Sequence, residues 1–263
     1  MKARAILVPV YDLETRRHAL ALLSDGRSLN SVSRHTGISR SAIREWTVRI
    51  EPLPRRSGTS CGLCAETPSP PAPAAEYVYL LGLYLGDGCI SAHRRGVQCL
   101  RIACDNRWPG LIDAAAGAVQ AVWPGNRVCR VRAPGCTYVK VYSKHLVCHF
   151  PQHGPGRKHH RRIRLEPWQQ DMADSHPWEL VRGLFHSDGC RTTNRIVRHL
   201  ADGPRHYEYP RYFFTNASED IMRLCTATLD RLGVAWKRTG ARNISVARRE
   251  SVALMDLHVG AKY

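Results

Sequence analysis

Two segments of the sequence carry the same pattern of small and acidic residues. A glycine, three variable residues and a small residue are followed by Asp-Gly in both Gly82-Leu83-Tyr84-Leu85-Gly86-Asp87-Gly88 and Gly183-Leu184-Phe185-His186-Ser187-Asp188-Gly189. The repetition indicates an internal duplication that brings Asp87 and Asp188 together. Two adjacent carboxylates repel each other unless a cation lies between them, and Mg²⁺ is a hard cation that binds carboxylate and phosphate oxygens together. The pattern therefore predicts metal-assisted cleavage of a phosphodiester, with both aspartates as metal ligands.

Each segment is predicted to end a helix that carries small residues along one face. Residues four apart lie on the same face of a helix, and the small residues so placed are Gly82 with Gly86 and Gly183 with Ser187. Two such faces permit close approach of helix backbones, so the two helices are predicted to cross with almost no side chain between them. Gly88 and Gly189 are predicted to be the C-cap residues that end these helices. The crossing would place both aspartates at neighbouring helix C-termini.

The elements after each motif recur in the same order, which extends the duplication. The first half is predicted to form a hairpin over 89–106, a helix over 111–122 and strands over 127–132 and 138–142. The second half is predicted to form a hairpin over 190–216, a helix over 218–232 and strands over 234–238 and 243–247. This order predicts an α+β fold, with one antiparallel sheet per half and helices packed on one face of each sheet.

The two motifs resemble the nine-residue signature of the LAGLIDADG homing endonuclease family, which aligns with residues 80–88 and 181–189. The resemblance covers residues 76–263, as two repeats over about 76–165 and 177–263. The eighth position, the metal-binding acid of the family, is Asp in both copies. The sixth position, commonly acidic in the family, departs from the pattern as Leu85 and His186. The resemblance implies a pseudo-two-fold domain in a monomeric, Mg²⁺-dependent, site-specific endonuclease of double-stranded DNA.

Lysines near the site often assist catalysis in this family, and two lysines of this chain are candidates. Lys158 and Lys262 follow the two aspartates at similar distances along the sequence. Together with Asp87 and Asp188 they form the predicted catalytic set. The alternative is that both lysines are solvated residues of a loop and a tail.

The composition favours a polyanionic partner. The chain has 39 Lys and Arg against 22 Asp and Glu, a net charge of +17 and a pI near 9.9, which favours double-stranded DNA through counterion release. Alternation along the predicted strands places Val131 and Val141 away from the basic face of the sheet. The side chains predicted to contact DNA from the first sheet are Arg101, Arg130, Arg132, Lys140 and Tyr142.

Residues 1–57 are predicted to form a separate helix-turn-helix domain. An amphipathic helix over 13–23 precedes two helices within 28–49 that are joined by a turn at Gly37-Ile38-Ser39. The predicted apolar face consists of Val32, Ile38, Ile43 and Trp46. The exposed positions of the second of these helices, which would contact DNA, include Arg40, Ser41 and Arg44. The alternative is a three-helix module that binds protein.

Residues 58–75 are predicted to be a semi-rigid linker, because 67–73 are rich in proline. Cys61 and Cys64 have the spacing of half a zinc site, but no second Cys-x-x-Cys follows in the sequence. A tetrahedral zinc site would need distant residues such as Cys148, His149 or His153. The alternative is a pair of free thiols.

Two functions fit the sequence. One is the endonuclease, with the N-terminal domain adding sequence recognition, and the other is a transcription regulator that retains the fold but binds DNA without cutting it. Retention of both aspartates favours cleavage, whereas Leu85 and the attached helix-turn-helix favour regulation. The sequence shows neither a signal peptide nor a run of about 20 apolar residues. We therefore expect a cytoplasmic protein with no membrane partner.

Overall fold

The computed structural model describes residues 11–51, 61–65, 68–200 and 203–263. The chain divides into two compact units, Met1–Ser60 and Cys61–Tyr263, and each is described by itself. The predicted linker over 58–75 lies only partly within the described residues, because 58–60 and 66–67 lie outside them.

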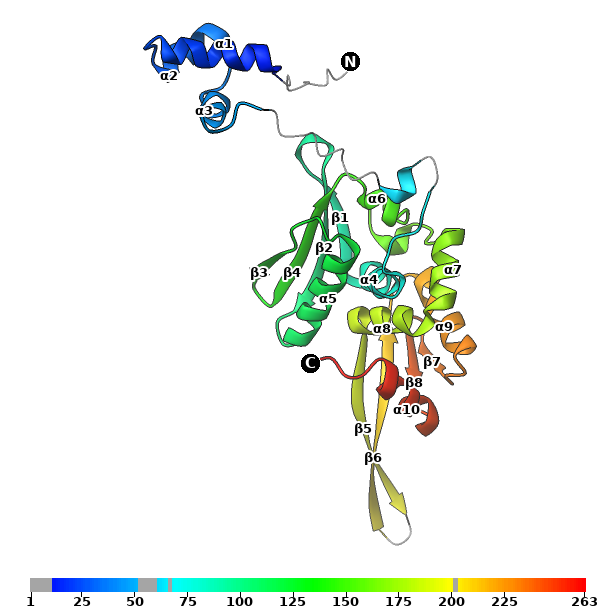
Figure 1. Cartoon of the computed structure of the whole chain (residues 1–263). Coiled ribbons are helices and arrows are strands. Elements are labelled where there is room, and N and C mark those ends of the chain that lie inside the picture. Colours follow the sequence, from blue (N-terminus) through cyan, green and yellow to red (C-terminus); the bar gives the residue numbers. More distant parts are fainter. Residues whose placement is uncertain (1–10, 52–60, 66–67, 201–202) are drawn as a thin grey trace. The chain divides into compact units, whose positions relative to one another are not determined.

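Three short helices form the described part of the first unit. They are α1 (Leu13–Ser24), α2 (Leu29–Thr36) and α3 (Arg40–Val48) (Figure 1). Each begins after a residue whose side chain accepts a hydrogen bond from a first-turn N–H, namely Asp12, Ser28 and Ser39. Gly37 ends α2 with a φ of 70°, which permits the tight turn into α3. The predicted apolar residues Val32, Ile38, Ile43 and Trp46 are all buried in one core.

The second unit contains two halves with the same strand order. The first half consists of α4 (Ala74–Asp87), β1 (Gly88–Ala92), β2 (Gln98–Asp105), α5 (Pro109–Val122), β3 (Cys129–Ala133) and β4 (Cys136–Ser143). The second half consists of α8 (Pro177–Asp188), β5 (Gly189–Leu200), β6 (Gly203–Thr215), α9 (Glu219–Arg231), β7 (Lys237–Gly240) and β8 (Asn243–Val246). Both sheets are antiparallel, in the orders β1-β2-β4-β3 and β5-β6-β8-β7. The predicted α+β class is confirmed.

Three helices of the second unit lie outside the repeated pattern that the sequence predicts. They are α6 (Leu146–His149), α7 (Pro167–Ser175) and α10 (Arg249–His258). Short 3₁₀ turns also occur at η1 (Gly62–Cys64), η2 (Arg94–Gly96) and η3 (Lys158–His160). α6 and η3 stand in the segment that joins the two halves, and α10 packs on α8 and β6. Among the described helices, none is long and apolar enough to cross a membrane.

The helices α4 and α8 contact each other at the centre of the second unit, between the two sheets (Figure 1). A Cβ on Gly82 would lie 2.8 Å from the backbone of Gly183, and a Cβ on Gly183 would overlap the carbonyl oxygen of Tyr79. One turn further on, a Cβ on Gly86 would overlap Oγ of Ser187. The small residues thus lie where the two helix backbones meet.

Gly88 and Gly189 directly follow the last residues of α4 and α8, as predicted, but their conformation differs from that of a typical C-cap glycine. Both are extended, with φ of −83° and −105°, whereas a typical C-cap glycine is left-handed. A Cβ on Gly88 would lie 2.5 Å from Cα of Tyr84, and a Cβ on Gly189 would lie 2.8 Å from Cα of Phe185. Each strand starts directly at the helix end, so the chain passes close over the last turn and leaves no space for a side chain.

Candidate active site

Asp87 and Asp188 are the last residues of α4 and α8, so the crossing of these helices brings them to one place. Oδ2 of Asp188 lies 2.8 Å from the position that a Cβ on Gly86 would occupy. Both aspartates line a cleft of about 540 Å³, and Asp87 also lines a second cleft of about 470 Å³. The structure therefore brings together the two carboxylates that the motifs single out.

The surroundings of the two carboxylates favour their protonated forms. Burial, followed by the charge of Asp188, raises the pKa of Asp87 to about 6. Burial also raises the pKa of Asp188, although Asn216 opposes this by donating a 2.7 Å hydrogen bond from Nδ2 to Oδ2. The side chain of Asp87 is exposed at the cleft, but the protein atoms around the cleft reduce its hydration. A divalent cation fits here, because it would offset both the lost hydration and the repulsion.

Lys158 and Lys262 lie at the C-terminal ends of the same two helices. Lys158 Nζ donates hydrogen bonds to the last carbonyl oxygens of α4, those of Tyr84, Leu85 (3.0 Å) and Gly86 (2.8 Å). Lys262 Nζ donates to the carbonyl oxygen of Ser187 in α8 at 2.9 Å. Burial lowers the pKa of Lys158 to about 8 and also lowers the pKa of Lys262, while the two aspartates act in the opposite direction. The structure thus places one lysine at each helix end, beside the aspartates.

The segment that carries Lys158 is held in place by hydrogen bonds from side chains to its backbone carbonyl oxygens. The guanidinium of Arg161 donates to the carbonyl oxygens of Gly154 at 2.9 Å and Gly156 at 2.8 Å, which closes the loop on itself. At its start, the hydroxyl of Tyr77 in α4 donates to the carbonyl oxygen of His149 at 2.6 Å. The position of Lys158 is therefore tied to α4 at both ends of the loop.

His186, at the sixth position of the second motif, is a buried positioning residue. Its Nε2 contacts the carbonyl oxygen of Val259 at 3.1 Å, and its Nδ1 contacts the hydroxyl of Tyr79 at 3.0 Å. Because a carbonyl oxygen only accepts, Nε2 carries the proton and Nδ1 accepts from Tyr79. Burial lowers the pKa of His186 to about 4, so the ring is neutral near pH 7. Val259 leads into the segment that carries Lys262, and His186 fixes that segment on α8.

Two polar residues beside the aspartates are not predicted from the sequence. Asn216, directly after β6, donates to Asp188, and Asp105, the last residue of β2, lines the second cleft with Lys262. Asp105 is also paired with Arg107 at 2.6 Å. Both residues lie at or directly after the end of the second strand of their half. Aligning the strand ends of the two repeats is the signal that could have identified them.

Mg²⁺ is expected to raise the melting temperature of the protein more near pH 7 than near pH 5. The pKa of Asp87 is raised to about 6, so below that pH a proton competes with the cation. In the metal-free protein, this raised pKa contributes stability that is present near pH 4 and lost as the pH rises through about 6. Thermal unfolding with and without Mg²⁺ across this range measures the difference.

The His186 titration does not obscure this result. Its lowered pKa contributes stability that is present above about pH 6.5 and lost as the pH falls toward about 4, with or without Mg²⁺, so it cancels in the difference between the two conditions. A Mg²⁺-induced shift that is the same at all pH values would contradict metal binding at Asp87.

Basic and aromatic side chains lie on the face of the first sheet that is turned away from its core. Arg101 of β2 is paired with Lys140 of β4, and their charged ends lie 5.8 Å and 5.5 Å from the ring centre of Tyr138. Tyr142 projects to the same face, two residues after Lys140, and is 37% exposed. Three of the predicted DNA contacts, Arg101, Lys140 and Tyr142, therefore share one surface.

Arg130 and Arg132 lie on the other face of this sheet, which corrects the prediction. Arg130 in β3 is paired with Val139 in β4, and directly paired residues of antiparallel strands project to the same face. Val139 is fully buried, and Arg130 accordingly binds Asp113 of α5 at 2.5 Å. Val131 takes the outer face instead and is 41% exposed. Alternation shows which residues of β3 project to the same face, but the register with β4 decides which of the two faces is covered by the helices.

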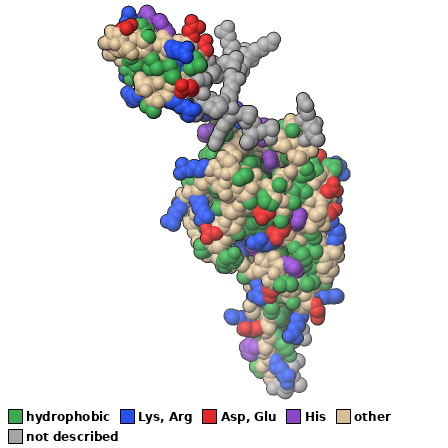
Figure 2. Space-filling view, viewed as in Figure 1, with side chains coloured by type: hydrophobic (Ala, Val, Ile, Leu, Met, Phe, Trp, Pro, Cys, Tyr) green, Lys and Arg blue, Asp and Glu red, His purple; other side chains and the backbone are tan. Residues whose placement is uncertain are grey.

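The second sheet has a similar outer surface. The guanidinium of Arg211 in β6 lies 5.5 Å from the ring centre of Tyr209 and 5.3 Å from that of Phe213. Within the described residues, Nε of both Arg101 and Arg211 is buried without a hydrogen-bond partner. The hairpin of β5 and β6 extends beyond the rest of its sheet (Figure 1), and Lys and Arg side chains mark this hairpin and the surface beside the first sheet (Figure 2).

In the first unit, the predicted contact residues of α3 are accessible. Arg40, Ser41 and Arg44 are all exposed, while Ile43 and Trp46 on the other side of the helix are buried. The helix therefore presents a polar face to solvent, which a duplex or a protein partner could contact.

Comparisons with known proteins give similarity at the level of structure. No protein-family model matches the sequence, and no curated protein matches it significantly. The homing endonuclease I-DmoI in complex with DNA and Mn aligns at 14% identity and a TM-score of 0.45, over 72% of this chain and 98% of that chain. The N-terminal LAGLIDADG domain of WhiA aligns at 12% identity and a TM-score of 0.43, over 80% of this chain and 95% of that domain. The LAGLIDADG meganuclease I-AabMI bound to uncleaved DNA aligns at 10% and 0.42, over 69% and 83%.

Proposed function

We propose that the chain is a divalent-metal-dependent endonuclease that cuts double-stranded DNA at specific sites, as a monomer with an internal pseudo-dimer. The observation that carries this proposal is the meeting of Asp87 and Asp188 at neighbouring helix ends, with Lys158 and Lys262 bound to the same two ends. One carboxylate and one ammonium group at each helix end suit an enzyme that acts on both strands of a duplex.

Each residue of the site has a chemical role in this proposal. Asp87 and Asp188 would hold the cation, with Mg²⁺ as the natural choice for carboxylate and phosphate oxygens. The bound cation would stabilise the charge that develops on the phosphate and activate the attacking water. Lys158 and Lys262 would position phosphate oxygens in the clefts, and Asn216 would orient Asp188 through its 2.7 Å hydrogen bond.

The outer faces of the two sheets are the proposed DNA interface. Arg101 and Lys140 on the first sheet and Arg211 on the second lie beside aromatic rings, an arrangement that suits phosphate contacts from the arginines and lysine. The first unit is proposed to be a helix-turn-helix domain that contacts DNA through Arg40 and Arg44 of α3. Phosphate contacts fix the register, and contacts to base edges select the sequence.

Replacing Arg101 and Lys140 by Ala is expected to weaken DNA binding and to lower its salt dependence. Each lost phosphate contact makes the slope of log K against log salt concentration less steep by about 1. The slope of the double variant is therefore expected to be less steep than that of the wild type by about 2. Arg130→Ala is the matched control, because that side chain faces the helices and is paired with Asp113. Fluorescence anisotropy on one duplex at several salt concentrations measures both. An equal loss in the control would contradict the assigned face.

A non-cleaving regulator is the second candidate, and one observation favours it. Leu85 and His186, at the sixth positions of the motifs, are both buried and bring no carboxylate to the clefts. Such a protein would use the sheets and α3 to bind DNA and would retain the aspartates without catalysis.

A binding selection followed by a cleavage assay separates the two functions. Duplexes that bind the full chain are selected from a random library and then incubated with Mg²⁺ or Mn²⁺. Double-strand cuts at the selected sequence that require the metal support the endonuclease. Tight, specific binding without cuts under either metal supports the regulator.

A further inference from the structure

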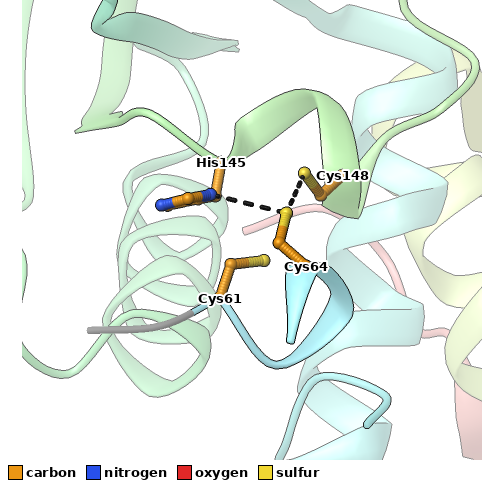
Figure 3. Close-up of side chains that lie close together, drawn as sticks. All are labelled: Cys61, Cys64, His145 and Cys148. Atoms are coloured by element: carbon orange, nitrogen blue, oxygen red, sulfur yellow. Dashed lines mark hydrogen bonds between the residues drawn. The ribbon is translucent and has the colours of Figure 1, made fainter. Parts of the chain in front are cut away.

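Four metal-binding side chains from two distant segments converge away from the aspartate pair. Cys61 and Cys64 lie at the ends of the turn that contains η1. His145 directly precedes α6, and Cys148 lies within it. One ligand atom from each residue lies within 4.8 Å of all the others. Figure 3 shows the three sulfurs and the imidazole ring close to one another, with Cys64 between His145 and Cys148.

Each segment presents its two ligands from a single tight turn. The N–H of Cys64 donates to the carbonyl oxygen of Cys61 at 2.8 Å, and the N–H of Cys148 donates to that of His145 at 3.2 Å. Two residues separate the ligands in both segments, the short spacing that brings two side chains of one turn onto a single ion. The two turns face each other, so their pairs combine into a set of four.

We propose that Cys61, Cys64, His145 and Cys148 form a structural Zn²⁺ site. Three thiolates and an imidazole are a typical closed set for tetrahedral zinc, and soft sulfur ligands select against Mg²⁺. Tetrahedral bond lengths place sulfur and nitrogen ligands about 3.6 Å apart and two sulfurs about 3.8 Å apart. The distance from Cys64 Sγ to His145 Nδ1 is 3.6 Å, and that from Cys64 Sγ to Cys148 Sγ is 2.9 Å. The two sulfurs are too far apart for a disulfide bond, which is about 2.05 Å long. Their separation would increase by less than about 1 Å on binding an ion.

The structure changes the set of ligands that the sequence suggests. Cys148 joins the site, but His149 turns away, with its Nδ1 on the carbonyl oxygen of His145 at 3.0 Å and its ring 5.1 Å from that of Trp123. His153 lines the cleft of the aspartates instead. His145 supplies the fourth ligand, a role that the sequence does not predict for it.

The site would fasten the chain at the start of the second unit to the segment that carries Lys158. Phe150 directly follows α6, and its ring centre lies 4.3 Å from that of Tyr84 in α4. The same segment continues to Lys158, whose Nζ binds carbonyl oxygens at the C-terminal end of α4. With four protein ligands the site leaves no position open for substrate, so its role is structural.

Metal analysis of the purified full chain, prepared without a histidine tag, tests this proposal. One zinc per chain is expected, and cobalt substitution is expected to give the absorption of tetrahedral, thiolate-bound Co²⁺. Cys64→Ser and His145→Ala are expected to lose most of the zinc, whereas the matched controls Cys129→Ser and His153→Ala retain it. Neither readout depends on DNA or on Asp87 and Asp188, so failure here is distinct from failure of the proposed nuclease.

Thiol titration of the wild-type protein covers the case in which the variants fail to fold. Removing the metal with a chelator is expected to make three more thiols reactive, and adding one equivalent of Zn²⁺ is expected to protect them again. Reduced protein that binds no zinc or cobalt stoichiometrically would overturn the proposal. So would a disulfide between Cys64 and Cys148, seen as two thiols that react only after addition of a reductant and assigned to these residues by peptide mapping.

Discussion

Replacing Asp87 and Asp188 together by Asn is expected to abolish metal-dependent DNA cleavage while leaving DNA binding nearly unchanged. Asn keeps the shape of the side chain but removes the charged oxygens that would hold the cation. Because a catalytic metal contributes several kcal/mol to transition-state stabilisation, the cleavage rate should fall by about 10³-fold or more. The DNA contacts are proposed to come from the sheets and α3, so binding is expected to survive. Single-turnover cleavage and anisotropy on the same duplex measure the two effects.

The same double variant is expected to melt at a higher temperature than the wild type near pH 8 without metal. In the wild type, burial raises the pKa of both aspartates, and the charge of Asp188 raises that of Asp87 further, so ionising them destabilises the folded state. The neutral amides remove this cost, and Mg²⁺ should no longer raise the melting temperature. Asp171→Asn, at an exposed position of α7, is the control for loss of a carboxylate. Undiminished cleavage by the double variant would exclude these aspartates as metal ligands.

Periodicity and spacing predict the repeated helices and strands and the centre of the site, but not α6, α7 and α10. The helix ends at Asp87 and Asp188 follow from the glycines directly after them. The crossing of the two helices follows from the small residues before them, because residues four apart share a helix face. The predicted strand over 138–142 lies within β4 (Cys136–Ser143), and the predicted helix over 111–122 lies within α5 (Pro109–Val122). The similar offsets of Lys158 and Lys262 from the two aspartates anticipate their places at the helix ends, because a duplication roughly preserves chain length between equivalent points.

Contacts between distant segments are not accessible from the sequence where no repeated motif indicates them. The face on which Arg130 projects depends on its pairing with Val139, and alternation within one strand carries no information on that register. Similarly, His145 joins Cys61 and Cys64 only because the chain places α6 against η1.

Gly82→Ala and Gly183→Ala are each expected to destabilise the second unit and to disturb the aspartate pair. A Cβ on Gly82 would lie 2.8 Å from the backbone of Gly183, and a Cβ on Gly183 would overlap the carbonyl oxygen of Tyr79. Backbone atoms cannot turn aside as a flexible side chain can, so the helices must separate. Overpacking of this kind costs about 1–3 kcal/mol or more. Since 1 kcal/mol shifts the melting temperature by about 2–4 °C in a domain of this size, calorimetry should resolve each variant.

The matched control for both substitutions is Gly117→Ala in α5. A Cβ at this position would meet no atom within 4 Å, so Ala is expected to stabilise the helix by about 0.5–1 kcal/mol. The double variant of Gly82 and Gly183 is expected to be less destabilised than the sum of the single variants, because both methyl groups require the same separation of the helices. Since Asp87 and Asp188 depend on this crossing, cleavage should fall in step with stability in the two interface variants and remain unchanged in the control. Melting temperatures that are equal in all three single variants would show that the helix backbones do not meet at these glycines.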